Sequence, residues 1–150
     1  MNGSAGWLVQ LARERYQAIH ELQLRMVAAR RAGCLPNTLL LLEHAPVFTL
    51  GRRADERDIL ASARELAAAG IDVERVERGG LVTYHGPGQL VGYPILDLHE
   101  LGLGASDYMH TLEAVLCAVL CDCGLEPVLR KDQIGVWIGR AKIASLGVRI

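Results

Sequence analysis

One stretch, residues 77–89, constrains the fold of this chain more than any other: Glu-Arg-Gly-Gly-Leu-Val-Thr-Tyr-His-Gly-Pro-Gly-Gln. Two runs rich in strand-forming residues, 81–84 and 90–96, flank a compact His-Gly-Pro-Gly turn. Glycines on both sides of His85 remove side chains, so the backbone can approach a ligand closely there. The stretch therefore predicts two strands joined at a ligand-binding turn.

The length and charge of the chain exclude several classes of protein. Its 150 residues fit one domain with a hydrophobic core, and no repeat or linker divides them. A formal net charge of −1 argues against a nucleic-acid partner, and no apolar run approaches the ~20 residues of a membrane-spanning helix. Residues 1–6 lack the features of a signal peptide, and two glutamates in the arginine-rich first helix disfavour an organellar presequence. We therefore expect a cytoplasmic protein.

The spacing of apolar residues predicts three helices. The first covers residues 13–32 and stops at Gly33, and the second lies within residues 58–69, with Ser62 and Gly70 as caps. The third covers residues 106–123 and carries one charge between positions 112 and 121, so we expect burial on most sides. The residues expected to be almost fully buried are Leu112, Val115, Leu116, Val119 and Leu120.

Cysteines suggest a metal site only weakly. His110, Cys117 and Cys121 share one stripe of the third helix, but the sequence offers no fourth ligand, so small core cysteines are the better interpretation. The chain has four cysteines, Cys34, Cys117, Cys121 and Cys123, and none of them has Cys-x-x-Cys spacing. A disulfide scaffold is not expected in a chain that is 51% hydrophobic.

Strands are predicted over residues 37–44, apolar on both faces and so interior, over 71–76, and in the C-terminal part from residue 128. Gly139-Arg140 predicts a two-residue type II′ hairpin that pairs Trp137 with Lys142 and Val136 with Ile143. Lys142 then heads an apolar face. The residues alone leave three roles open for it: a guard at a sheet edge, a cation–π partner of Trp137, or a functional amine.

Two polar residues bracket the glycine-rich stretch. Arg78 is either an exposed partner of Glu74 or Glu77 or part of a site, and His85 on its turn is the better functional candidate. His44, before a proline-bounded turn, indicates a structural role. Neither glycine pattern of phosphate-binding loops is present, so the stretch is a weak candidate for nucleotide binding.

Three segments of the chain together resemble one family. Residues 78–89, Arg-Gly-Gly-x-x-Thr-Tyr-His-x-Pro-Gly-Gln, with Tyr93 beyond them, resemble the signature of lipoyl(octanoyl) transferases. Residues 43–51, Glu-His-x-Pro-Val-Phe-Thr-x-Gly, and 139–150, Gly-x-x-Lys-Ile-x-Ser-Leu-Gly-x-Arg-Ile, are similar to two further family segments. The resemblance implies a single catalytic domain over residues 1–150, with the mixed α/β (α+β) fold of biotin/lipoate protein ligases.

The resemblance also implies an activity. Such an acyltransferase moves an octanoyl group from octanoyl-acyl carrier protein to its own cysteine and then to a lysine of a lipoyl domain. The implied acceptors are the 2-oxoacid dehydrogenase E2 subunits and the glycine cleavage H protein, in protein lipoylation. No metal, nucleotide or organic cofactor is implied, because the substrate arrives as a thioester.

Site residues follow from the same resemblance. Lys142 is implied to lie beside the nucleophilic cysteine and to lower the pKa of its thiol. One wall of the acyl pocket is implied to consist of Arg78, Gly79, Gly80, Leu81, Val82, Thr83, Tyr84 and His85. The backbone of Ser145, Leu146 and Gly147 is implied to line the acyl site, where N–H groups can hold the thioester oxygen. Whether His85 donates a hydrogen bond or transfers a proton stays open.

The chain departs from the family pattern at the nucleophile. The attacking cysteine of the family lies in a Pro-Cys-Gly segment downstream of residues 139–150, and residues 1–150 contain none. We therefore expect a member truncated before its catalytic cysteine, without the acyl-enzyme step. Two alternatives remain: an ATP-dependent lipoate or biotin protein ligase, and a non-catalytic domain that binds the acyl carrier or a lipoyl domain.

Overall fold

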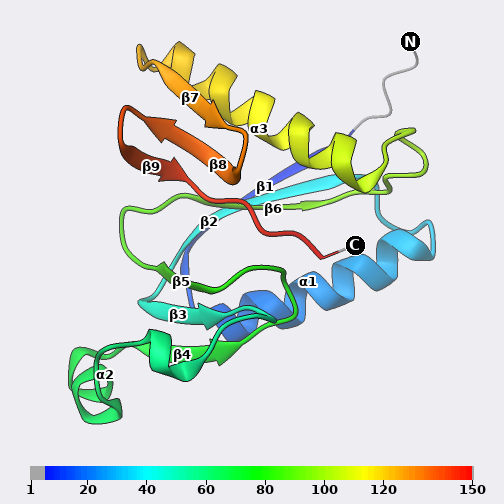
Figure 1. Ribbon diagram of the computed structural model, residues 1–150. Helices are drawn as coiled ribbons and strands as arrows, with labels where there is room; N and C mark the ends of the chain where they lie inside the picture. The colour runs from blue at the N-terminus through cyan, green and yellow to red at the C-terminus, as the bar shows by residue number, and fades with distance from the viewer. Residues whose placement is uncertain (1–5, 150) are drawn as a thin grey trace. The chain divides into compact units, whose positions relative to one another are not determined.

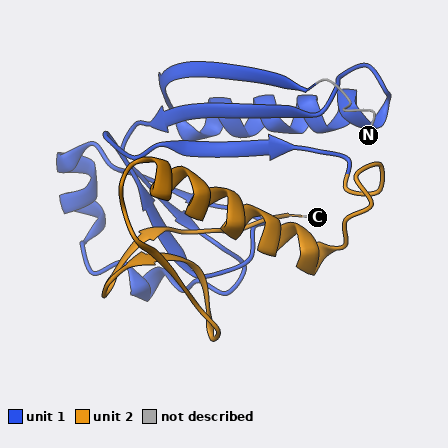
Figure 2. Cartoon of the chain, turned by 90° about the horizontal axis from the view of Figure 1, so that it is seen from above, with its two compact units in different colours: residues 1–97 blue, residues 98–150 orange. Residues whose placement is uncertain are grey.

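The computed structural model describes residues 6–149 and shows two compact units, Met1–Asp97 and Leu98–Ile150 (Figure 2). The sequence predictions for residues 1–5 and for Ile150 lie outside the described part. Residues 6–149 contain three α-helices, a short 3₁₀ helix and three small sheets (Figure 1), which confirms the predicted mixed α/β class. No helix in this part has the length and apolar character to cross a membrane.

A three-stranded sheet in the order β1-β2-β6 forms the core of the first unit. Its strands are β1 (Trp7–Glu14), β2 (Thr38–His44) and β6 (Val91–Ile95), with β1 parallel and β6 antiparallel to β2. Parallel neighbours need a crossover, and helix α1 (Tyr16–Arg31) supplies it. Side chains alternate along β2, so Leu40 and Leu42 are buried with Ile19 of α1. The predicted interior strand is confirmed.

The first helix begins later than predicted. Residues 13 and 14 belong to β1, a strand that the sequence analysis missed, and α1 starts at Tyr16. Pairing explains the difference, because Arg13 lies opposite Glu43 in the parallel ladder and forms an ion pair with it at 3.0 Å. At the other end, Gly33 stands just past α1 with φ +71, as the predicted stop requires.

A second sheet of the first unit has the order β4-β3-β5. Its strands are β3 (Val47–Leu50), β4 (Asp72–Arg75) and β5 (Val82–His85), so the turn after His85 joins two different sheets. The predicted helix over residues 58–69 is shorter than expected. It consists of α2 (Ala63–Ala69), with a capping box from Ser62 and Gly70 in the left-handed region, after a separate 3₁₀ turn, η1 (Glu56–Asp58).

The second unit packs helix α3 (Ala105–Asp122) with the strands β7 (Pro127–Arg130), β8 (Gln133–Ile138) and β9 (Ala141–Ala144). The strands form an antiparallel sheet in chain order. The predicted pairing of Trp137 with Lys142 is confirmed. The pairing of Val136 with Ile143 is wrong, because an irregularity after Val136 shifts the register and places Ala144 opposite it.

The predicted burial of α3 is also wrong. Val115 and Val119 are each 53% exposed, and Leu112, Leu116 and Leu120 are half-buried. Within its unit the helix contacts β7 and β8, so a small sheet covers only part of its surface. The apolar sequence of α3 predicts that its surface is suited to burial. How much of that surface is buried depends on the size of the sheet that packs against it.

Candidate active site

The predicted site residues fall in both units. Arg78, Gly79, Gly80 and Leu81 form the loop that enters β5, and Val82, Thr83, Tyr84 and His85 are β5 itself. Lys142 lies on β9 of the second unit, and Ser145, Leu146 and Gly147 follow the end of that strand. Within each unit these residues are close neighbours along the chain, on one loop and strand in the first unit and on one strand and the segment after it in the second. Their convergence on one cleft stays a prediction.

Thr49 organises the loop that holds Arg78. The guanidinium Nη2 donates to the Thr49 carbonyl at 2.9 Å and to the Thr49 hydroxyl at 2.8 Å, while Nη1 donates to the Gly79 carbonyl at 3.0 Å. The side chain is half-buried, and this burial lowers the pKa of Arg78. The geometry is that of a cation fixed by neutral oxygen acceptors, unlike the exposed ion pair considered for it in the sequence.

Gln89 sets the tautomer of His85. The Gln89 amide nitrogen donates to the Tyr84 carbonyl at 3.3 Å, which turns its oxygen Oε1 toward His85 Nδ1 at 2.6 Å. Because an amide oxygen can only accept, Nδ1 carries the proton and Nε2 keeps its lone pair, 3.5 Å from the Thr49 hydroxyl. Burial lowers the pKa of His85, so the neutral ring offers a proton acceptor at Nε2.

His44 lies behind this site as a fully buried ring at the end of β2. Its Nδ1 lies 3.1 Å from the Glu14 carbonyl, so it must donate, and Nε2 then accepts from the Tyr93 hydroxyl at 2.7 Å. The ring lies 5.7 Å from that of His85 and 5.3 Å from that of Tyr16. Burial lowers the pKa of His44 and raises the pKa of Tyr93, so both stay neutral. Both ring nitrogens of His44 have partners, as a structural role requires.

Sequence reasoning gave no role to Thr49 or Gln89. Both stand in motifs that it singled out, Thr49 in residues 43–51 and Gln89 as the last residue of 78–89. Their position inside these motifs was the only feature of the sequence that could have indicated a role for them. Their contacts with Arg78 and His85 depend on β3 lying beside β5, a pairing that no local pattern indicates.

Gly51 allows the loop around Arg78 to pass close to β3. A Cβ atom at position 51 would lie 2.5 Å from the Gly80 carbonyl oxygen and 2.9 Å from Arg78 Nη1, whereas a Cβ at position 79 would meet nothing within 4 Å. We expect Gly51→Ala to lower the free energy of unfolding by about 1–3 kcal/mol, as overpacking does. Gly79→Ala, the matched control, should change it by no more than about 0.5 kcal/mol. Urea unfolding measures both, and equal losses would contradict the close approach.

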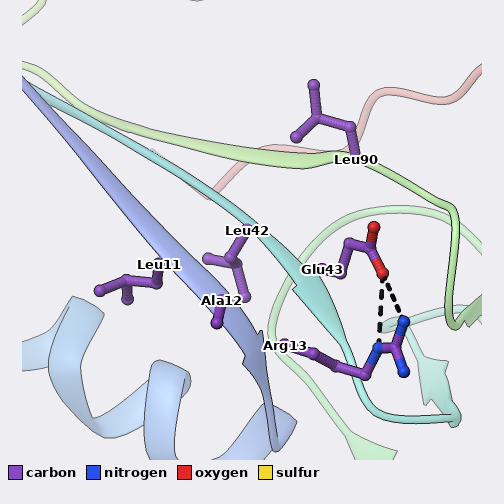
Figure 3. A pocket seen from close by; sticks show the side chains of 6 residues that line it. All are labelled: Leu11, Ala12, Arg13, Leu42, Glu43 and Leu90. Carbon is purple, nitrogen blue, oxygen red and sulfur yellow. Dashed lines mark hydrogen bonds and ion pairs between the residues drawn. The ribbon is translucent and has the colours of Figure 1, made fainter.

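A pocket of about 350 Å³ opens on the first unit (Figure 3). Its lining residues are Leu11, Ala12, Arg13, Leu42, Glu43 and Leu90. The Glu43 carboxylate accepts from the Gly88 backbone N–H at 3.1 Å as well as from Arg13, and these two donors lower its pKa. The wall of the pocket thus ties the turn that follows His85 to strands β1 and β2.

Lys142 is exposed and has two partners in its own unit. Its ammonium donates to the Ile134 carbonyl at 2.7 Å and lies 5.0 Å from the centre of the Trp137 ring. The cation–π contact weighed from the sequence is therefore present. All four cysteines carry free thiols: Cys117 is half-buried and Cys34, Cys121 and Cys123 are exposed. The expectation that α3 buries Cys121 is wrong, because the small sheet of the second unit covers only part of that helix.

Comparisons with known sequences point to one family. Residues 15–150 match the family model described as lipoyl protein ligase A/B catalytic domain. The chain is 44% identical over 156 residues to an octanoyltransferase from Acidobacterium capsulatum, a match that covers 95% of the chain and 63% of the relative. An octanoyltransferase from Syntrophobacter fumaroxidans is also 44% identical, with 96% of the chain and 63% of the relative covered. The chain thus spans less than two thirds of the length of these relatives.

Solved structures agree on the fold. The structure of P. falciparum LipL1 in complex with lipoate has a TM-score of 0.68 at 11% identity, covering 92% of this chain and 42% of that one. The bi-partite lipoate protein ligase of Thermoplasma acidophilum has a TM-score of 0.64 at 16% identity, covering 91% of this chain and 52% of that one. These likenesses confirm the predicted fold of the lipoate protein ligase type.

Proposed function

Because the chain belongs to the lipoyl protein ligase A/B catalytic domain family, we propose that it serves as an acyltransferase of the octanoyltransferase type. The observation that carries this proposal is the 44% identity to octanoyltransferases over about 95% of the chain. In the proposed reaction the thiolate of the family's Pro-Cys-Gly cysteine, which residues 1–150 do not contain, attacks the thioester of octanoyl-acyl carrier protein, and the carrier thiol leaves. A lysine amine then attacks the new thioester, forms an amide, loses a proton and restores the cysteine.

Each motif has a role in this proposal. Lys142 supplies the positive charge that favours the thiolate of the nucleophile, and the backbone of residues 145–147 faces the thioester oxygen. Residues 78–85 are proposed to line the acyl pocket, and the Nε2 lone pair of His85 can take the proton that the attacking lysine amine loses. We propose that both motifs face one cleft of a single catalytic domain, since both resemble walls of one acyl site.

The proposed acceptors are lipoyl domains of lipoate-dependent enzymes, namely 2-oxoacid dehydrogenase E2 subunits and the glycine cleavage H protein. The Thermoplasma ligase was solved as a lipoylation system with its E2 lipoyl domain, which supports this class of partner. Free thiols on the four cysteines fit a reducing cytoplasm, the compartment that we propose. The second candidate, an ATP-dependent lipoate ligase, draws support from the fold that the chain shares with such ligases.

Two proteins test the function: the 150-residue chain, and a chimera that adds the remaining residues of the Acidobacterium relative. Each is incubated with octanoyl-acyl carrier protein and then with a lipoyl domain, and intact masses are recorded. We expect the chimera to form a hydroxylamine-sensitive octanoyl adduct and to pass it to the lipoyl domain without ATP.

The 150-residue chain is the control, and we expect no adduct on its own cysteines because none has the sequence context of the family nucleophile. An adduct on Cys34, Cys117, Cys121 or Cys123 would show that the nucleophile was misplaced. Transfer by the chimera that requires ATP would identify a ligase. Binding of the carrier or lipoyl domain with no turnover in either protein would identify a non-catalytic domain.

A further inference from the structure

Lys142 lies across the backbone of a buried glycine on the neighbouring strand. Gly135 in β8 has φ +133, and a Cβ atom built there would lie 2.4 Å from Lys142 Cε and 3.0 Å from its Nζ. A real Cβ atom essentially never lies 2.4 Å from another atom, so the end of the Lys142 side chain occupies space that a side chain at position 135 would need. The glycine thus leaves room for the end of the exposed Lys142 side chain.

The Lys142 ammonium has two partners on β8. The ammonium donates to the Ile134 carbonyl at 2.7 Å and lies 5.0 Å from the centre of the Trp137 ring, which is itself 3% exposed. A carbonyl oxygen and the face of an indole ring both attract a cation. From β7, the Arg130 guanidinium lies 4.9 Å from the same ring centre. The Trp137 ring on β8 therefore lies close to two cations, Arg130 from β7 and Lys142 from β9.

Two features fix Gly135 itself. Its backbone N–H donates to the Glu113 carboxylate at 3.1 Å, which joins β8 to α3 through the one charged residue between positions 112 and 121. The register shift after Val136 places Ala144 opposite that residue while Lys142 stays opposite Trp137. Irregular pairing beside a glycine of positive φ is typical of a bulge that redirects a side chain.

We propose that Gly135 and Trp137 are positioning residues for Lys142. The lysine side chain is flexible, and the open space at Gly135 and the contact with the indole ring favour one position of its ammonium before a thiol approaches. The relevance of this placement to catalysis rests on the proposed function, in which Lys142 activates the cysteine. The placement itself belongs to the chain without substrate and can be measured there.

Amine labelling of the 150-residue chain tests the placement. The chain has two lysines, so exposed Lys131 is an internal reference for Lys142. After a brief reaction with a small amine-reactive ester, mass spectrometry gives the ratio of the two modification rates. We expect Lys142 to react several-fold more slowly than Lys131, and Gly135→Ala and Trp137→Phe to raise its relative rate toward that of Lys131.

Gly139→Ala is the matched control. Gly139 also has positive φ, but a Cβ there would meet nothing within 4 Å, so this change strains the backbone without touching the lysine. We expect it to leave the labelling ratio unchanged. A parent ratio near one, or an equal rise in the Gly135 and Gly139 variants, would overturn the proposal.

Thermal unfolding of Gly135→Ala, Lys142→Ala and the double variant gives a second readout. The Gly135→Ala change should lower the midpoint by several degrees in the parent and by less in the Lys142→Ala background, because Cε and Nζ are then absent. The clash with the Ala144 carbonyl, at 2.6 Å, remains in both backgrounds. Equal losses would overturn the proposal. Were Gly135→Ala too unstable to purify, Trp137→Phe, which keeps Gly135, decides by amine labelling: a raised Lys142 rate would support the proposal, and an unchanged rate would overturn it.

The two proposals fail independently. An extended enzyme that transfers no acyl group would contradict the proposed function while the labelling ratio and the thermal coupling stayed as expected. Active transfer with an unchanged labelling ratio would contradict the positioning role alone.

Discussion

Replacing His44 with alanine should lower the free energy of unfolding by about 3–5 kcal/mol. The ring has no exposed surface, so the substitution leaves a cavity. It also leaves the Tyr93 hydroxyl and the Glu14 carbonyl without their present partner. Urea unfolding measures the loss. The control is His20→Ala, since His20 is half-buried and stacks on Tyr16 at 6.0 Å, and its loss should stay below about 1 kcal/mol. Similar losses in both variants would contradict the structural role of His44.

The free energy of unfolding should also decrease as the pH falls below about 6.5. Burial lowers the pKa of both His44 and His85 below the value of about 6.5 that unfolded histidine has. Below pH 6.5 the unfolded chain therefore binds more protons than the folded chain. The contribution of these two rings to the free energy of unfolding is thus complete above that pH and declines as the pH falls. The decline should be shallower in His44→Ala than in the parent, and an unchanged slope would contradict the assignment.

Substituting Lys142 by alanine should slow acyl-enzyme formation about 30-fold at pH 7 in an extended form of the enzyme that is active. Without the ammonium the cysteine returns to its ordinary pKa of about 8.5, and about 3% of it is then thiolate at pH 7. Raising the pH deprotonates the thiol, so the variant should regain most of the rate by about pH 9, whereas the parent should change little.

Single-turnover mass spectrometry across this pH range measures the effect. Lys131→Ala is the matched control, because it removes the other lysine of the chain from an exposed position that no motif includes. Parallel pH profiles for the parent and Lys142→Ala would mean that the lysine does not act on the thiol. A loss that persists at high pH would instead indicate that Lys142 contacts the substrate.

Local patterns predicted the elements whose boundaries depend on nearby residues. The cap of α2 at Ser62, the stop after α1 and the hairpin at Gly139 all arise from backbone preferences within a few positions. The central strand β2 was predicted because four consecutive leucines leave no polar face. The family signature directed attention to the residues around His85 and Lys142, although their roles remain proposals.

Features that depend on distant partners could not be predicted in this way. The assignment of residues 13 and 14 to β1 comes from their pairing with Glu43 and His44, 30 positions away. The tautomer of His85 depends on an amide oriented by the Tyr84 carbonyl, and the register of Val136 depends on a bulge. In each case the deciding interaction joins segments that no periodicity relates. The exposure of Val115 likewise depends on the size of a sheet that a helical pattern does not record.

The position of β2 between β1 and β6 has a consequence during synthesis on the ribosome. β1 and α1 precede β2 in the chain, but the strand that covers its other edge, β6, begins at residue 91, almost 50 residues after β2 ends. At a translation rate of about 5–20 residues per second, that edge waits roughly 2–10 s for its partner. During this interval a run of four leucines presents unpaired N–H and C=O groups, the combination that promotes association between nascent chains. The strand at the centre of the native core is thus also a segment whose second edge stays unpaired for a time during synthesis.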